Sequence, residues 1–329
     1  MDPVAALIEI AELLERERAS RYRARAFRQA AATFEALPED VRTDPSRLRA
    51  AKGIGSSTFE VIRQAQAGEV PDYLRELRGT VEPERVSELR ARLRGDLHCH
   101  SDWSDGTTSL ESMADAARAL GHEYLAVTDH SPRLRVARGL SAERLREQIP
   151  LVRGLSGGGL TVLAGVEVDI LERGALDQND ELLDELDIVV ASVHSLLRME
   201  AAPMTARMIA AVSDPRVDVL GHVTGRLVQG ERGTRPPSQF DARAVFAACA
   251  DNGVAVEINS RPERQDPPDE LIAIALEEGC LFSIDSDAHA PGQLSLLDYG
   301  AERAERAGVP AERIVTTWGL ERLRAWSRG

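Results

Sequence analysis

The sequence predicts an α/β protein in which a parallel sheet closes into a (β/α) barrel behind a small all-α domain. Apolar residues recur at helical spacing up to about residue 80, whereas from Gly95 on short β-rich runs alternate with amphipathic stretches. Seven alternating runs imply a parallel sheet, and this number of βα units favours closure into a barrel. An open doubly wound sheet is the alternative, but no Gly-rich dinucleotide fingerprint follows the first run.

Length and charge divide the chain into parts. We expect an all-α domain over residues 1–80, a charged linker or helix over 81–94, and the barrel over 95–329. The first 95 residues carry 17 basic and 16 acidic side chains, whereas the remainder carries 23 basic and 38 acidic ones. Three scattered cysteines without a CxxC pair indicate a reducing, cytoplasmic location. No apolar run approaches the roughly 20 residues of a membrane span, so no membrane partner is expected.

The first 80 residues predict a series of helices. Apolar residues share one face of a helix over 4–17, and a second helix covers 22–37. The stretch "LRAAKGIGSSTFEVIRQAQAG" predicts a helix, a Gly-Ile-Gly turn and a further helix. Ser57 and Glu60 are spaced as a capping box for that last helix.

Six of the seven histidines lie where β-rich runs end. The carboxyl ends of all strands in a parallel barrel meet at one face, so these side chains converge. His98 and His100 are two residues apart and point to the same side of a strand, whereas Cys99 faces away. His122 precedes a strand and is expected to be structural.

Clustered imidazoles and carboxylates predict a site for several metal ions. A lone histidine at a strand end is more often a satisfied polar residue, but a whole set on one barrel face has few structural uses. Ligands of this kind without thiolate suit Zn, Mn or Fe. The predicted ligands are His98, His100, Asp105, His130, Glu167, His194, His222, Asp287 and His289.

The ordered motifs resemble those of the PHP (polymerase and histidinol phosphatase) superfamily. They are "DLHCHSDWSDG", "TDHS", "GVEVDI", "SVHS", "GHVTGR" and "SDAH", within residues 95 to about 325. The resemblance implies a PHP fold, a distorted (β/α)7 TIM-like barrel with two to three divalent ions. The family usually has proline where this chain has Val223, so we expect altered loop geometry there. The implied ligand sets are His98, His100, Glu167 and Asp287 for one ion, Asp105, His130 and His289 for a second, and Glu167, His194 and His222 for a third.

Metal-activated water would then attack a phosphate ester, since bound cations lower the pKa of water and offset charge at phosphorus. Arg226 and Arg264 follow the fifth and sixth runs and are predicted to bind phosphate oxygens, with Arg138 as a third candidate. Each could instead be a surface or salt-bridging residue. Asp129 and Asp169 lie beside predicted ligands and could orient their imidazoles, or they could equally be ordinary structural acids.

The front helices resemble the small DNA-binding domain of bacterial family X DNA polymerases, and "KGIGSSTFEVI" resembles a helix-hairpin-helix. The resemblance implies DNA binding through residues 1–80, with Gly53 and Gly55 letting backbone amides approach a phosphate. Lys52, the sole lysine, is expected to face that phosphate, and Arg21 and Arg25 lie on one helix face. A tight αα-hairpin and a solvated arginine stripe remain the alternatives.

No polymerase core fits between the two parts, so the sequence predicts a phosphoesterase without polymerase activity. We expect a hydrolase that acts on DNA 3′ ends in repair, as a 3′–5′ exonuclease or 3′-phosphatase. A small-molecule phosphatase of the histidinol phosphate kind is the second possibility. A non-catalytic DNA-binding scaffold with structural metals is the third.

Overall fold

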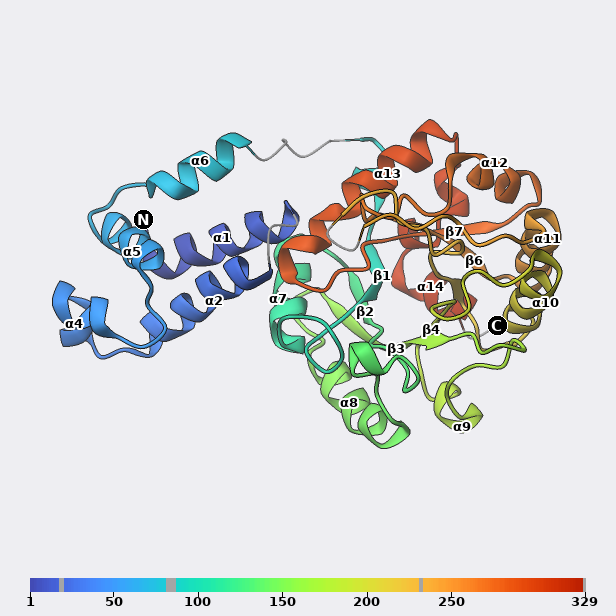
Figure 1. Ribbon diagram of the computed structural model, residues 1–329, viewed down its shortest axis with the longest axis horizontal. Coiled ribbons are helices and arrows are strands. Elements are labelled where there is room, and N and C mark those ends of the chain that lie inside the picture. The colour runs from blue at the N-terminus through green and yellow to red at the C-terminus, as the bar shows by residue number, and fades with distance from the viewer. Residues whose placement is uncertain (18–20, 81–86, 231–232, 328–329) are drawn as a thin grey trace. The chain divides into compact units, whose positions relative to one another are not determined.

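A computed structural model describes residues 1–17, 21–80, 87–230 and 233–327 (Figure 1). The chain divides into two compact units, one comprising Met1–Glu84 with Ala290–Gln293 and the other Arg85–His289 with Leu294–Gly329. Of the predicted linker, residues 81–86 lie outside the described part. The rest contains the short 3-10 helix η1 (Arg90–Arg92).

Two long helices, α1 (Pro3–Arg16) and α2 (Arg21–Ala36), begin the first unit, each within one residue of its predicted range. Asp2 caps α1, because its carboxylate accepts a hydrogen bond from the Ala5 amide at 2.7 Å. Pro3 occupies the first turn, where a missing N–H has no intrahelical partner to lose. The apolar face of α1 is buried against α2 and α5 (Ser56–Gln66), as the spacing predicts.

The Gly-Ile-Gly turn joins α4 to α5. Gly53 has φ +100°, a left-handed conformation that favours glycine, and Ile54 is buried in the core of the unit. The predicted capping box of Ser57 and Glu60 is wrong. The helix begins earlier, so Gly55 is the N-cap and donates its N–H to Thr58 Oγ1 at 2.9 Å. The remaining helices of this unit are α3 (Glu39–Arg42), α4 (Pro45–Ala50) and α6 (Asp72–Thr80).

Seven parallel strands form the sheet of the second unit in the order β1 to β7, which confirms the predicted (β/α)7 barrel. The barrel nearly closes, because the His100 amide donates to the Ala288 carbonyl at 2.7 Å and so joins the end of β1 to the segment after β7. The strands are β1 (Gly95–Cys99), β2 (Tyr124–Val127), β3 (Thr161–Asp169), β4 (Ile188–Ser192), β5 (Val219–Leu220), β6 (Ala255–Asn259) and β7 (Leu281–Asp285).

Helices surround the strands (Figure 1). They are α7 (Leu110–Ala119), α8 (Ala142–Gly154), α9 (Asp180–Leu183), α10 (Ala201–Val212), α11 (Ala242–Asn252), α12 (Asp269–Glu277), α13 (Leu297–Arg306) and α14 (Leu320–Ser327), with short 3-10 helices η2 (Arg135–Ala137), η3 (Pro291–Leu296), η4 (Ala311–Arg313) and η5 (Val315–Thr317). Within the described ranges, no helix is a candidate for a membrane span.

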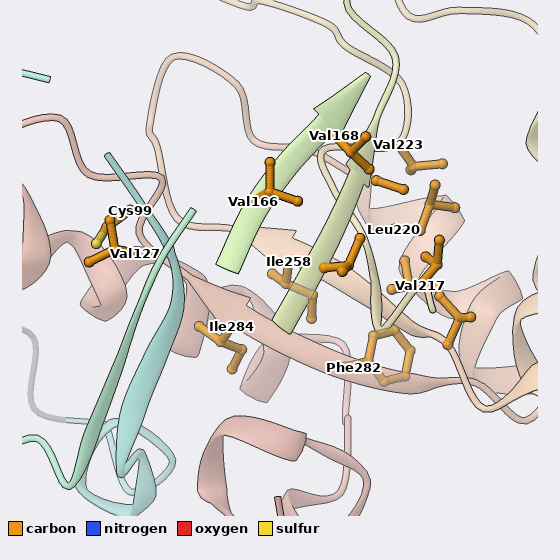
Figure 2. Close-up of a cluster of buried hydrophobic side chains, with 14 of the residues drawn as sticks. Cys99, Val127, Val166, Val168, Val217, Leu220, Val223, Ile258, Phe282 and Ile284 are labelled. Carbon is orange, nitrogen blue, oxygen red and sulfur yellow. The ribbon is translucent and has the colours of Figure 1, made fainter. Parts of the chain in front are cut away.

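Two apolar clusters hold the barrel together. The larger lies between strands and helices, and Figure 2 shows Val166, Leu220 and Phe282 among its members. A smaller cluster gathers residues that begin strands, such as Tyr124 and Ile188, with side chains from the C-terminal segment. Each fully buried side chain of this size contributes roughly 1.5–3 kcal/mol. The amino end of the barrel is therefore apolar, which leaves the carboxyl end for polar groups.

Candidate metal centre

The nine predicted ligands lie at the carboxyl ends of six strands. His98 lies in β1 and Glu167 in β3, and the others lie in the segments that follow strands. Their convergence follows from the topology, because a barrel of parallel strands turns all carboxyl ends to one face. Six imidazole rings crowd together there, with neighbouring centroids between 4.3 Å (His100 and His289) and 6.3 Å (His130 and His289) apart.

Glu167 lies at the middle of this cluster and is 1% exposed. The register of β3 directs its carboxylate among imidazoles from four other strands. Its Oε2 lies 3.3 Å from His98 Nε2, 3.5 Å from His100 Nε2 and 2.9 Å from His130 Nδ1, and its Oε1 lies 3.2 Å from His194 Nε2 and 2.8 Å from His222 Nε2. One carboxylate therefore contacts five of the six clustered histidines.

Two aspartates complete the cluster. Asp105 Oδ1 lies 3.4 Å from His130 Nε2 and 3.3 Å from His289 Nε2. Asp287 Oδ1 lies 3.5 Å from His100 Nε2. Asp287 has φ +50°, a strained conformation for a non-glycine residue that turns its carboxylate back towards β1.

The donor set fits divalent cations. Buried atoms without a hydrogen-bond partner in the described residues include His98 Nε2, His100 Nε2, Asp105 Oδ1, Glu167 Oε2 and His194 Nε2. These are the atoms that a cation binds, and buried polar atoms otherwise need partners.

Three overlapping groups place one ligand atom per residue within 4.8 Å of one another. They are His100, Asp105, His130 and His289; His98, His100 and Asp287; and His130, Glu167 and His194. His222 belongs to none of these groups in the described part of the chain, although it contacts Glu167.

Opposite pKa shifts within the cluster follow from its charges. Burial favours the neutral acid in Glu167, but His194, His98 and His130 outweigh it and hold the pKa of Glu167 well below its ordinary value. Burial and the neighbouring His289 and His130 lower the pKa of His100 to about 3. The Glu167 carboxylate is therefore ionised and the His100 ring is neutral at pH 7, the states that metal ligands require. Burial alone would lower the pKa of His130, but Glu167 and Asp105 outweigh it and raise this pKa to about 10, so a cation that binds this ring would displace a proton.

Carboxylates and carbonyls outside the nine fix some of the rings. Asp169 accepts a hydrogen bond from His194 Nδ1, as expected. Asp129 instead accepts from Ser101 and Ser104 and holds the loop after β1, so of the two alternatives the structural one applies to it. The sequence analysis missed Glu257, which accepts from His98 Nδ1 at 2.5 Å. A charged residue in the apolar run "VAVEINS" is a signal that could have found it.

The three candidate arginines occupy different surroundings. Arg264 is 7% exposed, and its Nε donates to Asp287 Oδ2 at 3.0 Å. Arg226 Nε donates to the Arg264 carbonyl at 3.1 Å, so this side chain supports the loop after β6. Arg138 is exposed, and its Nη2 donates to the Asp102 carbonyl at 3.2 Å. The sequence analysis also missed Arg261, whose Nη1 donates to the Asp287 carbonyl at 2.8 Å.

The candidate DNA-binding residues lie in the first unit. Lys52, Gly53 and Gly55 are exposed in and beside the hairpin turn, and Arg25 is exposed on α2. Arg21 begins α2, and its side chain lies outside the described part. The hairpin borders a pocket of about 860 Å³ whose lining includes Phe27 and Tyr73, two rings stacked with centroids 5.5 Å apart.

Comparison with known proteins defines the class. Residues 96–261 match the family model of the PHP domain, and residues 1–69 match that of a helix-hairpin-helix domain. The chain belongs to the PHP family, and it is a metal-dependent hydrolase of phosphate esters.

Similar proteins fall into two groups. The DNA polymerase/3′-5′ exonuclease PolX of Bacillus subtilis is 35% identical over 237 residues, which are 71% of this chain but 41% of that protein. The chain thus spans less than half of that relative. A probable phosphatase of Vibrio parahaemolyticus is 33% identical over 234 residues, covering 68% of this chain and 88% of that protein. The structure of a Lactococcus lactis histidinol phosphate phosphatase with zinc, L-histidinol and phosphate aligns with a TM-score of 0.49 and 18% identity, covering 65% of this chain and 94% of that one.

Proposed function

We propose that the chain hydrolyses phosphate esters at DNA 3′ ends, as a 3′–5′ exonuclease or a 3′-phosphatase. One observation carries this proposal: a single chain joins the PHP barrel, with its cluster of histidines and carboxylates, to a helix-hairpin-helix domain. The similarity to a polymerase with 3′-5′ exonuclease activity supports it. Such a hydrolase would contribute to DNA repair.

The clustered residues would hold two or three divalent cations, Zn, Mn or Fe. His98, His100 and Asp287 form one set, and Asp105, His130 and His289 form a second with His100 near both. Glu167 would be shared, with His194 and His222 on the side of its Oε1. Bound cations would supply an acidified water as nucleophile and would offset charge on the phosphoryl oxygens.

The chain's own groups prepare this chemistry. Asp169 accepts from Nδ1 of His194, so the Nε2 atom of this ring points its lone pair into the cluster. Arg264 Nη1 is buried without a hydrogen-bond partner in the described residues. We assign it, ahead of Arg226 and Arg138, to donate to a phosphoryl oxygen, because the other two guanidinium groups bind backbone carbonyls.

The hairpin would hold the DNA backbone. The first turn of α5 carries N–H groups without intrahelical partners, and a phosphate is stabilised at such a helix start. Gly53 and Gly55 lack side chains that would keep the backbone of a nucleic acid away. Exposed Lys52 and Arg25 add positive charge, although the acidic barrel limits long-range attraction of DNA.

A small phosphomonoester is the second candidate substrate. The observation in its favour is that the probable phosphatase of Vibrio parahaemolyticus matches this chain over 88% of its own length. In this case the front helices would serve association. The scaffold alternative is not retained, because the family is one of hydrolases.

Parallel assays separate the two substrates. The full chain, supplied with Mn or Zn, is offered 3′-phosphorylated DNA, 3′-hydroxyl DNA and histidinol phosphate. We expect turnover of at least one DNA substrate, with His98→Ala inactive on it. Turnover of histidinol phosphate alone would contradict the DNA assignment.

A further inference from the structure

β6 is the one strand of the described barrel that neither contains nor is directly followed by any of the nine predicted ligands, yet it holds a carboxylate beside the cluster. Glu257 lies in its middle and is 0% exposed. Because β6 lies between β5 and β7, its inward residues face the ligands that follow both neighbours. Burying a carboxylate destabilises the folded state unless its oxygens accept hydrogen bonds, so the hydrogen-bond partners of Glu257 indicate its role.

Both oxygens of Glu257 accept hydrogen bonds. Oε1 accepts from His98 Nδ1 at 2.5 Å. Oε2 accepts from the backbone N–H of His222 and from Asn259 Nδ2, the latter at 3.1 Å. One carboxylate thus contacts the ring of a predicted ligand in β1 and the backbone of another after β5.

The bond to Nδ1 fixes the tautomer of His98. A proton on Nδ1 leaves the lone pair on Nε2, which lies 3.3 Å from Glu167 Oε2 and within the cluster. The bond to the His222 amide fixes the backbone position of His222 directly after β5, and therefore the position from which its imidazole reaches into the cluster. We propose that Glu257 is a positioning residue that holds His98 and His222 together in the geometry that binds metal. This inference rests on the ligand assignments of the proposed function and is independent of the substrate.

Because both carboxylate oxygens of Glu257 accept hydrogen bonds, replacing one of them by an NH2 group tests their role. In Glu257→Gln the side chain keeps its size, but its NH2 group must face either His98 Nδ1–H or the N–H groups at the other oxygen. A donor then opposes a donor, and one buried group loses its partner. Asp187, directly before β4, is a matched control, because the described contacts of this buried carboxylate are with the Ala164 amide at 3.0 Å and with Arg153. Asp187→Asn can still accept from the Ala164 amide through its amide oxygen while losing the same charge.

The experiment measures metal binding by the full chain. Metal-free wild type, Glu257→Gln and Asp187→Asn are titrated with Co(II) against a competing chelator, followed by visible absorption and by metal content after desalting. We expect Glu257→Gln to bind metal about 10- to 100-fold more weakly with an altered Co(II) spectrum, the usual cost of losing an orienting partner. Asp187→Asn should stay within about threefold of wild type, because its described contacts are with none of the predicted ligands.

Equal losses in the two variants would overturn the proposal, because charge alone would then explain them. Wild-type affinity and spectrum in Glu257→Gln would overturn it too. Circular dichroism of the metal-free proteins checks folding. If Glu257→Gln does not fold, Glu257→Asp replaces it: its shorter side chain keeps the charge but reaches one partner, so an unchanged affinity contradicts the proposal. Wild type that binds no Co(II) would overturn the ligand assignments themselves, whereas metal binding without DNA hydrolysis would count against the proposed substrate alone.

Discussion

The barrel and the helical front unit use their polar residues in opposite ways. In the barrel, the candidate site consists of buried and half-buried side chains that lie in or after six strands. In the front unit, the candidate DNA-binding groups whose burial the structure describes, namely Arg25, Lys52, Gly53 and Gly55, are exposed and lie within one short turn and one helix. The first arrangement is fixed by topology, whereas the second depends on local backbone shape. The two sites should therefore respond to different perturbations.

Removal of metal gives the largest expected effect and should distinguish most clearly between the activity of the barrel and the DNA binding of the front unit. Dialysis against a chelator should abolish phosphoester hydrolysis, and added Mn or Zn should restore it, because the nucleophile depends on bound cations. Binding of labelled DNA by the front unit, measured by fluorescence anisotropy, should persist in the chelated protein. Loss of both properties together would show that DNA binding also needs the metal centre.

His122 tests whether a histidine outside the cluster is structural. Burial, with a smaller contribution from Arg90, lowers the pKa of His122 from 6.5 to about 4. The unfolded chain binds the proton first as pH falls, so this group reduces stability progressively between pH 6.5 and about 4, and not above. His122→Leu should remove that dependence, on the order of 3 kcal/mol over this window.

Urea unfolding of wild type and the His122→Leu variant at about pH 7 and pH 4.5 measures the difference. Comparing the two proteins at each pH cancels the titration of the clustered histidines, which both contain. If the free energy of unfolding depends on pH equally in both proteins, His122 does not cause the loss of stability at low pH.

Gly53→Ala tests the local backbone of the hairpin. The residue has φ +100°, and an added Cβ would lie 2.6 Å from Thr33 Oγ1. Strain of about 1–2 kcal/mol in the turn should weaken DNA binding roughly tenfold while hydrolysis of a small ester stays unchanged. Gly68→Ala is the control, since it has φ +83° and no atom within 4 Å of an added Cβ. Equal effects of both substitutions would indicate general destabilisation.

Arg138→Ala should have the smallest effect. This side chain is exposed and binds a backbone carbonyl, so kcat/KM for a small ester should change by no more than about twofold. Arg264→Ala should lower kcat/KM by roughly 100-fold, because it removes the charged one of two donors to Asp287 Oδ2 and the candidate phosphate contact. A large effect of Arg138→Ala would reverse our assignment.

The barrel could be predicted from the sequence because its signals are periodic and repeated. Six of the seven β-rich runs end in potential ligands, and parallel topology alone then brings the ligands together. Helix ranges were likewise accessible from apolar spacing, with α1 and α2 displaced by one residue. The structure places all nine predicted ligands in one cluster, although their assignment to individual ions stays a prediction.

The contacts around the ligands could not be predicted as well from the sequence, because they depend on the direction in which side chains point across the barrel. Asp129 lies next to a predicted ligand in sequence but binds serines, whereas Glu257 is distant in sequence and contacts His98. Likewise, the sequence did not show where α5 begins. The helix starts at Ser56, so the capping contact joins Gly55 to Thr58 and not Ser57 to Glu60, and residue spacing alone does not distinguish these two pairs.

The three cysteines have a practical consequence for studying this protein. Cys99, Cys249 and Cys280 are each 0% exposed, and burial raises the pKa of all three thiols. Alkylating reagents attack accessible thiolates, so the native protein should be nearly inert to maleimides. A cysteine introduced at exposed Ser57 would then be the preferred point of attachment for a single dye, placed at the hairpin where DNA is expected to bind.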